Sequence, residues 1–366
     1  NGPLAKFPYP KDQGGQLRLT TSIHDAKINY QEEWPLMENL NGILTLAGTE
    51  LQMQVNNTKI LSASIQDINA KIPNVLEEDP VLFVNGNISS KGETLAEFID
   101  QSPLKERKSL QIIKQINLKG PTNIKLGLHI PLYPEDLTAI DGVLSFLGNT
   151  IDSEELNMQM NNFKGDIFFT RETVTANNIT ANYFDRTVNL TIPKIQDDES
   201  EYILISGDMD KSFVKQQITH YVPNIIDEIN PYLEYLSGQG IWQARYSLDA
   251  NNTDDTLFIT SDLQGIALRF PKPINKDALE RLPLTLEIPL SDSENNSLII
   301  KLEKLLTAKL NYTTDNDSEL KSLAVQFGSD PYNFKTSTGI EFRGSINELE
   351  LSSWLDVLNE DSAEPM

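Results

Sequence analysis

The sequence predicts a mainly β protein in which an elongated antiparallel sheet is built from repeated modules and carries a few short amphipathic helices. Three observations predict this fold class. Several segments alternate apolar and polar residues, which is the period of a strand with one dry face and one wet face. Polar clusters rich in Asn, Asp, Ser and Thr separate these segments and are typical of hairpin turns. Three sequence outlines, each containing a glycine, also recur along the 366 residues.

The alternating segments predict the strands. They lie at residues 17–30, 141–148, 245–252, 257–270 and 281–290. The most regular segment is RLPLTLEIPL, which places on one face Leu282, Leu284, Leu286, Ile288 and Leu290. Such a face fits an open apolar surface, and it also fits the sealed core of an ordinary β-sandwich. Alternation alone leaves both interpretations open.

The first recurring outline starts as a strand, passes through a glycine and continues as an amphipathic helix. It begins at VNGNIS with Gly86, at ISGDMD with Gly207 and at FRGSIN with Gly344. After each glycine, apolar residues fall at helical spacing. This spacing predicts helices near 95–99, across 212–236 with breaks at Pro223 and Pro231, and near 354–358. We expect each helix to cover or terminate one module of the sheet.

Two further glycine-containing outlines recur along the chain in a fixed order with the first one. A hairpin start contains Gly42, Gly142 or Gly265, and the strand that follows a helix contains Gly120 or Gly240. The outlines follow one another in the same order, while the segments between them vary in length as loops do in repeat proteins. They predict a partial module at 1–37 and modules at 38–137, 138–260 and 261–366. Chance recurrence of glycine in a strand-rich chain is the alternative.

Composition limits the classes of function. The 39% of hydrophobic residues is enough for a folded core. A net charge of -23, from 30 basic and 53 acidic residues, opposes binding to nucleic acid or to an anionic membrane surface. The absence of cysteine excludes disulfides, thiolate metal sites and cysteine nucleophiles. The opening residues NGPLAKFPYP look like the interior of a protein, so we expect the chain to be part of a longer one whose membrane anchor lies elsewhere.

Five stretches of the sequence occur in the order of one known family. They are GPLAKFPYP (2–10), YQEEWPLMENLNGILTLAGTEL (30–51), YLSGQGIWQARYSL (235–248), DLQGIALRFPKPINK (262–276) and GSINELELSSWL (344–355). Together they resemble the YhdP family of the AsmA-like superfamily, bridge-like lipid-transport proteins of the Gram-negative envelope. The resemblance implies a curved, taco-shaped or tubular β-sheet that is anchored in the inner membrane. It also implies a hydrophobic groove that conducts phospholipid across the periplasm towards the outer membrane.

The resemblance implies that the apolar faces of the strands line this groove. A phospholipid pulled into water exposes roughly 30 methylene groups at about 0.8 kcal/mol each, so an apolar groove removes most of a barrier on the order of 25 kcal/mol. The expected lining residues are Leu44, Leu46, Leu144, Phe146, Leu268, Phe270, Leu282, Leu284, Leu286, Ile288 and Leu290. The expected partners are phospholipid acyl chains, an inner-membrane anchor outside this chain and envelope proteins, with no nucleic acid.

Two other functions remain open at this point. A glycan-binding or glycan-active β-protein would use exposed aromatic residues such as Trp34, Trp242 and Trp354 as sugar platforms, and hydrolysis would require a carboxylate pair. A purely structural spacer of the envelope would bind no small molecule.

The sequence does not predict an enzyme. His24, His129 and His220 are far apart and lack the paired spacing of a zinc site, so we interpret each as a structural or surface histidine. Asp208 and Asp210 form an Asp-x-Asp pair that the other copies of the repeat lack, which favours turn chemistry over a metal-dependent transferase. The acidic run DNDSE (315–319) lacks the glycine and the distal glutamate of a calcium loop. We expect no catalytic residues, no metal and no cofactor.

Overall fold

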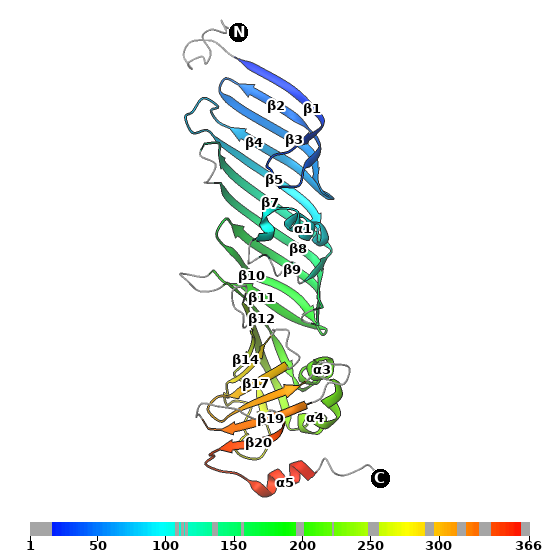
Figure 1. Ribbon diagram of the computed structural model, residues 1–366, viewed down its shortest axis with the longest axis vertical. Coiled ribbons are helices and arrows are strands. Elements are labelled where there is room, and N and C mark those ends of the chain that lie inside the picture. Colours follow the sequence, from blue (N-terminus) through cyan, green and yellow to red (C-terminus); the bar gives the residue numbers. More distant parts are fainter. Residues whose placement is uncertain are drawn as a thin grey trace. The chain divides into compact units, whose positions relative to one another are not determined.

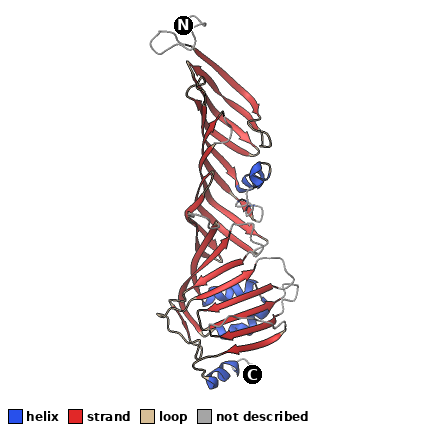
Figure 2. Cartoon of the chain, turned by 60° about the vertical axis from the view of Figure 1, so that its left-hand side comes forward, coloured by secondary structure: helices blue, strands red, loops and turns tan. Residues whose placement is uncertain are grey.

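The chain is a mainly β protein. The computed structural model describes residues 17–106, 116–133, 138–154, 157–194, 201–221, 223–247, 256–289, 296–312, 320–328 and 338–359, together with residues 110 and 113. These residues form twenty β-strands and a few short helices (Figures 1 and 2). The predicted fold class is confirmed.

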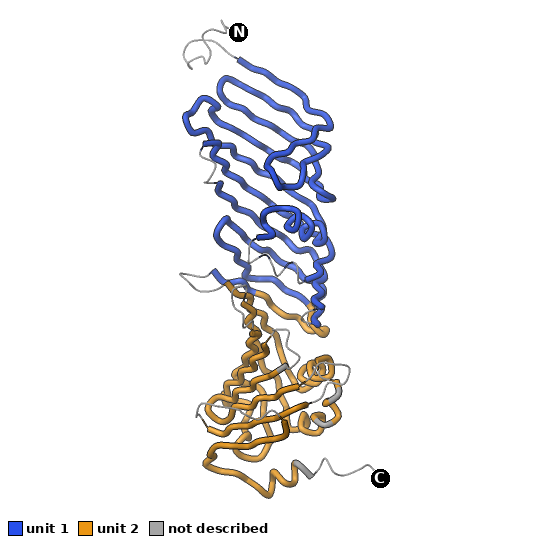
Figure 3. The backbone as a smooth tube through the Cα atoms, viewed as in Figure 1, with its two compact units in different colours: residues 1–181, 191–197 blue, residues 182–190, 198–366 orange. Residues whose placement is uncertain are grey.

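The chain divides into two compact units, which are described separately. Unit 1 comprises Asn1–Ala181 and Thr191–Asp197, and unit 2 comprises Asn182–Leu190 and Asp198–Met366 (Figure 3). Strand β11 (Arg186–Ile192) contains residues of both. The four modules predicted from the glycine outlines stay a prediction.

Unit 1 is an antiparallel sheet whose strands follow one another in sequence order. The strands are β1 (Arg18–Ile28), β2 (Met37–Ala47), β3 (Glu50–Ile60), β4 (Ala63–Ile72), β5 (Val81–Lys91), β6 (Asn117–Lys119), β7 (Pro121–Pro131), β8 (Ala139–Ser153), β9 (Met158–Thr170) and β10 (Val174–Tyr183). Pairing runs from β1 to β5, then through β7 and β8 to β9 and β10. The short β6 pairs with β8 beyond the end of β7. Successive hairpins therefore build the sheet, as the polar turn clusters predict.

Unit 2 contains a second run of paired strands. They are β12 (Tyr202–Asp210), β13 (Leu236–Ser247), β14 (Thr256–Ser261), β15 (Ile266–Leu268), β16 (Leu284–Pro289), β17 (Asn296–Leu302), β18 (Leu306–Tyr312), β19 (Leu320–Phe327) and β20 (Gly339–Gly344). Antiparallel pairing runs β12, β13, β14, β16, β17, β18, β19, and β15 pairs with the start of β13. Strand β20 is the exception among the registers of this unit, because it lies parallel to β19.

Bulges interrupt neighbouring strands of unit 1 at matching heights. The register shifts next to Asp25 in β1, Asn39 in β2 and Asp67 in β4, and each of these residues has a positive φ. Asn and Asp tolerate this left-handed conformation better than other residues with a side chain. A bulge bends its strand and changes the phase of side-chain alternation. The row of bulges therefore bends the sheet along one line.

Recurrent glycines make room for large side chains of the neighbouring strand. A Cβ atom at Gly142 would lie 2.2 Å from the ring of Phe169, its partner across β8 and β9. A Cβ atom at Gly207 would lie 3.2 Å from the indole nitrogen of Trp242, its partner across β12 and β13. In both places an aromatic ring covers the glycine backbone, which is a known way to stabilise glycine within a sheet.

Helix α1 (Gly92–Asp100) follows β5, and a 3₁₀ turn, η2 (Pro103–Glu106), comes after it. The helix lies on one face of the unit 1 sheet (Figures 1 and 2). Its first residue, Gly92, donates its backbone N–H to Gly120 O at 2.9 Å. A Cβ atom at residue 92 would lie 2.4 Å from Leu118 Cγ, so glycine lets the helix begin directly against β6. At its far end, Phe98 contacts Trp34, with 5.7 Å between ring centroids.

The predicted helical stretch of unit 2 is confirmed, with one correction. It consists of α3 (Lys211–Tyr221), the 3₁₀ turn η5 (Pro223–Ile225) and α4 (Ile226–Leu233). The predicted break at Pro223 is present. The predicted break at Pro231 is wrong, because this proline lies inside α4. Pro231 is near the end of this short helix, and its missing N–H removes one backbone hydrogen bond, to the carbonyl of Asp227.

Two aromatic contacts hold helices in unit 2. Phe213 of α3 stacks on Trp242 of β13, with the ring planes 15° apart and the centroids 5.6 Å apart. The last helix, α5 (Leu351–Asn359), follows β20 as predicted. Its Trp354 stacks on Phe270, and the Trp354 Nε1–H donates to Lys272 O at 2.7 Å.

Asp210, the second residue of the Asp-x-Asp pair, caps the N-terminus of α3 and so has a structural role. Its Oδ1 accepts the Ser212 hydroxyl at 2.6 Å, the Phe213 backbone N–H at 2.9 Å and the Arg186 guanidinium at 2.8 Å. The bond from Ser212, followed by those from Phe213 and Arg186, lowers the pKa of Asp210 from 3.8 to about 2.

Asp210→Ala is expected to lower the free energy of unfolding by about 1 kcal/mol at neutral pH, the usual cost of losing a helix cap. Because the folded-state pKa is below the ordinary value, this contribution is complete above pH 3.8 and is lost as the pH falls through about 2. Denaturant titrations of the chain and the variant at several pH values measure the difference. Equal stability at neutral pH would contradict the cap.

Candidate functional site

Unit 1 has one face covered with apolar side chains, here called apolar face 1. In antiparallel sheets, directly paired residues point to the same side. The registers of the paired strands therefore define rows across the sheet. One row consists of Leu44, Met53, Ala70, Val84, Leu128 and Ile140 on β2, β3, β4, β5, β7 and β8. A second consists of Ile65, Ile88, Ile124, Leu144 and Ile167 on β4, β5, β7, β8 and β9.

The two ends of apolar face 1 differ in burial. On the side of the bulges, Leu40 is 0% exposed and Val55 is 2% exposed. Helix α1 and the loop that carries Trp34 belong to this side. Beyond the bulges, Leu44, Leu128 and Ile140 of the first row are half-buried, whereas Ala70 is 7% exposed and Val84 packs against the Leu40 cluster. Apolar face 1 therefore joins a sealed strip to an open strip.

Unit 2 has a comparable face, here called apolar face 2. Its central row consists of Ala244, Ile259, Leu286, Ile300, Ala308, Val325 and Phe342 on β13, β14, β16, β17, β18, β19 and β20. Helix α3 packs on β12 and β13 at one end of the face. Farther along, Leu286 and Ile300 are half-buried, and Phe342 is 65% exposed.

The groove residues predicted in unit 1 all lie on apolar face 1. Leu44 and Leu46 belong to β2, and Leu144 belongs to β8; all three are half-buried. Phe146 is 7% exposed and meets Phe163 edge to face, with 4.9 Å between ring centroids. The three leucines are therefore accessible from solvent, whereas Phe146 forms part of the packed interior.

The residues predicted in unit 2 fall into two groups. Leu284, Leu286 and Ile288 lie together on β16 in apolar face 2 and are half-buried. Leu282 is half-buried and precedes the strand, while Leu290 lies outside the described residues. Leu268 lies in β15, which pairs with the start of β13, and is 7% exposed. Phe270 is held between Tyr235 and Trp354, with ring centroids 5.0 Å and 6.0 Å away.

Several residues of the apolar faces were missed by the sequence reasoning. Those in unit 1 are Met53, Val84, Ile124, Leu126, Leu128 and Ile140. Those in unit 2 are Ile259, Ile300, Leu310 and Leu323. The alternation in NIKLGLHI (123–130) carries the same signal as RLPLTLEIPL and would have placed three of them.

No metal-binding cluster of His, Asp and Glu is found in the part of the chain that the structure describes. There, no three His, Asp or Glu side chains come close enough to hold a metal ion. His129 contacts Phe83, with ring centroids 4.8 Å apart, and His220 contacts Phe184 at 5.1 Å. His24 is exposed on β1. The run DNDSE falls outside the described residues.

The tryptophans considered as sugar platforms are engaged in other contacts. Trp242 is 7% exposed and lies under Phe213. Trp34 contacts Phe98, and Trp354 docks α5 on Phe270. Their rings serve the packing of helices and loops.

A buried lysine in unit 2 also has a structural role. Lys276 is 4% exposed, and its Nζ donates to three backbone carbonyl oxygens, Leu263 O at 2.8 Å, Ile266 O at 2.6 Å and Asp277 O at 2.9 Å. Burial lowers the pKa of Lys276, and the nearby acidic residues oppose this effect. The three bonds tie together the loop around β15.

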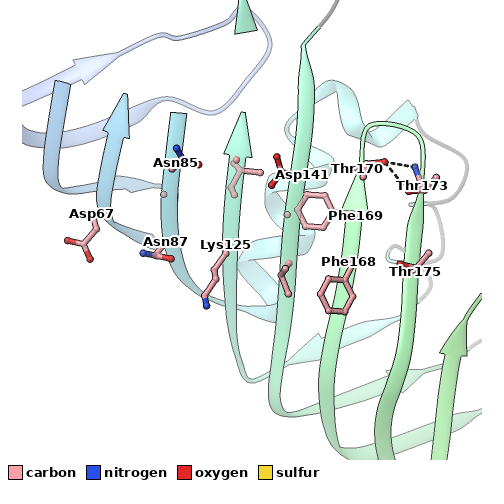
Figure 4. Close-up of a pocket in the computed structure, with 15 residues that line it drawn as sticks. Asp67, Asn85, Asn87, Lys125, Asp141, Phe168, Phe169, Thr170, Thr173 and Thr175 are labelled. Atoms are coloured by element: carbon pink, nitrogen blue, oxygen red, sulfur yellow. Dashed lines mark hydrogen bonds between the residues drawn. The ribbon is translucent and has the colours of Figure 1, made fainter. Parts of the chain in front are cut away.

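The face of unit 1 opposite apolar face 1 carries many polar side chains, and it contains a depression of about 470 Å³. The depression spans β5, β7, β8 and β9 (Figure 4). Successive residues of a strand point to opposite faces of the sheet. On β5, Asn85 and Asn87 therefore face the depression, while Val84 and Ile88 belong to apolar face 1. The two faces thus offer different chemistry.

The comparison with protein families identifies the chain. A family model described as YhdP protein matches residues 1–365. The chain belongs to the YhdP family. This membership confirms the resemblance carried by the five sequence stretches. Among curated proteins, the intermembrane phospholipid transporter YhdP of Escherichia coli strain K12 is 23% identical over 285 residues, which cover 77% of this chain.

The alignment covers 21% of the E. coli transporter, so this member of the YhdP family matches about a fifth of that protein's length. No solved structure matches the chain. Within the described residues, no helix is both long enough and apolar enough to cross a lipid bilayer.

Proposed function

We propose that this chain is a lipid-binding segment of a YhdP-family protein that conducts phospholipid between the inner and outer membranes along an apolar groove. The observation that carries the proposal is the open strip of half-buried aliphatic side chains on each apolar face. The name of the E. coli relative, an intermembrane phospholipid transporter, supports the same function.

The chemistry of the open strips suits acyl chains. The row from Leu44 to Ile140 contains only aliphatic and thioether side chains, which offer dispersion contacts and no hydrogen bonds. Each methylene group that leaves water for such a surface gains about 0.8 kcal/mol. A phospholipid lying on the strip would keep its head group in water at the rim. The proposed lining residues are the half-buried Leu44, Leu46, Leu144, Leu282, Leu284, Leu286 and Ile288.

The location and partners follow from the proposed function. A segment that passes lipid between two membranes would work in the periplasm of a Gram-negative bacterium, as part of a longer protein anchored in the inner membrane. Its direct partners would be the acyl chains of phospholipids. We propose that it moves them without chemical change, and therefore that it is not an enzyme.

Photo-crosslinking tests this function at neighbouring positions of one strand. A photo-crosslinking amino acid replaces either Leu286 on apolar face 2 or Glu287 on the opposite face, where Glu287 forms an ion pair with Lys301. The chain is produced in the periplasm of E. coli, irradiated and analysed by mass spectrometry. We expect phospholipid adducts at position 286 and none at position 287.

The same measurement can contradict the proposal. Equal labelling at both positions would indicate non-specific contact with membranes. Absence of lipid at position 286, together with absence at Leu144 of apolar face 1, would show that these faces do not carry phospholipid.

A further inference from the structure

The depression on the polar face of unit 1 gathers polar side chains that have no partner within the described part of the chain. Asn85, Asn87, Lys125 and Asp141 are all exposed, and none of their side chains has a hydrogen bond or ion pair with another described residue. Asp67 lies at the edge of the group and is equally unpaired among these residues. All five line one hollow (Figure 4).

Some polar side chains elsewhere on this face pair with one another. Asn41 Nδ2–H donates to Asn57 Oδ1 at 3.1 Å, and Gln52 Nε2–H donates to Asn69 Oδ1 at 3.2 Å. Close to the depression, the Ser145 hydroxyl donates to Asp166 at 2.6 Å. The unpaired side chains of the depression are available to a ligand, as are those of Gln66, Ser89 and Asn123 beside it on the same face.

The strand registers give the depression a defined layout. One row contains Asn87, Lys125, Val143 and Phe168, and the adjacent row contains Asn85, Gly127, Asp141 and Thr170. Gly127 is buried and has no side chain, so the carboxylate of Asp141 lies directly over its backbone. A Cβ atom at residue 127 would lie 2.9 Å from both carboxylate oxygens. Four strands at about 4.8 Å spacing make the rows about 14 Å long.

An aromatic ring stands at one end of the first row. Phe168 is 47% exposed, and its cross-strand neighbour is the half-buried Val143. Together they form a small apolar platform beside unpaired amides and carboxylates. A ligand that matches this surface has an apolar face and many hydroxyl groups.

Other ligand classes fit less well. Two carboxylates against one ammonium group, in a chain with a net charge of -23, oppose nucleotides and other phosphate-rich ligands. The strands of the depression are paired on both sides, so a peptide cannot add to the sheet by backbone hydrogen bonds. A sugar ring has C–H groups on one face to stack on Phe168 and hydroxyl groups around its edge to bond the amides and carboxylates.

We propose that the depression formed by Asn85, Asn87, Lys125, Asp141 and Phe168 binds a neutral oligosaccharide. The sugar stacks on Phe168, and the hydroxyl groups of the next ring donate to Asp141. This site lies on the side of the sheet opposite apolar face 1 and is independent of lipid binding.

Isothermal titration calorimetry of the whole chain tests the site with three probes: the β-1,4-linked N-acetylglucosamine tetrasaccharide, cellotetraose and maltotetraose. We expect saturable binding of at least one of them. Phe168→Ala is expected to weaken that binding at least about tenfold, because the stacking surface is lost. Asp141→Ala is expected to weaken it as well. Gly127→Val, which displaces the carboxylate of Asp141, is expected to abolish it.

A matched control distinguishes binding at this site from non-specific binding of sugar to exposed aromatic residues. Phe258 is 40% exposed on β14 in unit 2, on the side of the sheet opposite apolar face 2. Phe258→Ala is expected to leave sugar binding unchanged. Binding that persists unchanged in Phe168→Ala, or failure of all three probes to bind at millimolar concentration, would overturn the proposal.

Discussion

Leu40→Ala is expected to lower the free energy of unfolding by about 2–5 kcal/mol, whereas Leu44→Ala is expected to cost less than about 1.5 kcal/mol. Both leucines lie on β2 and point to apolar face 1. Leu40 is 0% exposed, so its removal leaves a cavity that the surrounding residues fill only in part. Leu44 is half-buried, so its removal loses fewer contacts and leaves a dent open to solvent.

Denaturant unfolding of the two variants measures this difference in stability. The two positions share residue type, strand and face, so they differ only in burial. A cost for Leu44→Ala as large as that for Leu40→Ala would mean that the whole face is sealed. In that case β2 would be the strand of an ordinary core, and the open strip of unit 1 would be lost as a route for lipid.

Leu286→Asp is expected to reduce the phospholipid that co-purifies with the chain by at least about tenfold while the chain stays folded. A carboxylate in the middle of the central row of apolar face 2 interrupts the apolar path, and water at the open strip can hydrate it. Native mass spectrometry counts the bound lipid, and circular dichroism follows folding.

Two further variants calibrate the effect of Leu286→Asp. Thr285→Asp places the same charge on the opposite side of β16, next to Lys301, and is expected to leave lipid binding unchanged. Ala308→Asp places the charge in the same row at a buried position, 7% exposed, and is expected to unfold the chain. If Leu286→Asp behaves like Ala308→Asp, this part of the face is core.

Alternation of apolar and polar residues predicted much of the fold, because successive side chains of a strand point to opposite faces of the sheet. It placed β1, β8, β14 and β16 and assigned Leu284, Leu286 and Ile288 to one side. The switch from strand to helix after a glycine predicted α1, α3 and α5. These features depend on local sequence alone.

Other features depend on more distant parts of the chain. The bulges at Asp25, Asn39 and Asp67 use residue types that are equally common in loops, so their sequence signal cannot be told from that of a turn. The parallel pairing of β20 with β19 leaves no trace in the alternation of either strand.

The candidate site shows the same limit. Leu40 and Leu44, or Leu144 and Phe146, are equally apolar in sequence, yet one of each pair is buried and the other is half-open. What separates them is the packing of residues distant in the chain, as between Phe146 and Phe163. The sugar site proposed around Phe168 was missed because it depends on the register of four strands.

The row of bulges also constrains how this protein can change in evolution. Each bulged strand contains two stretches of alternation that are out of phase, joined at one residue such as Asn39. Deleting that residue would make apolar and polar residues alternate without interruption along the strand. It would also move the side chains of one stretch to the opposite face of the sheet. Gain or loss of single residues should thus be confined to the hairpin ends, so strand length is inherited as a fixed unit while loops vary freely.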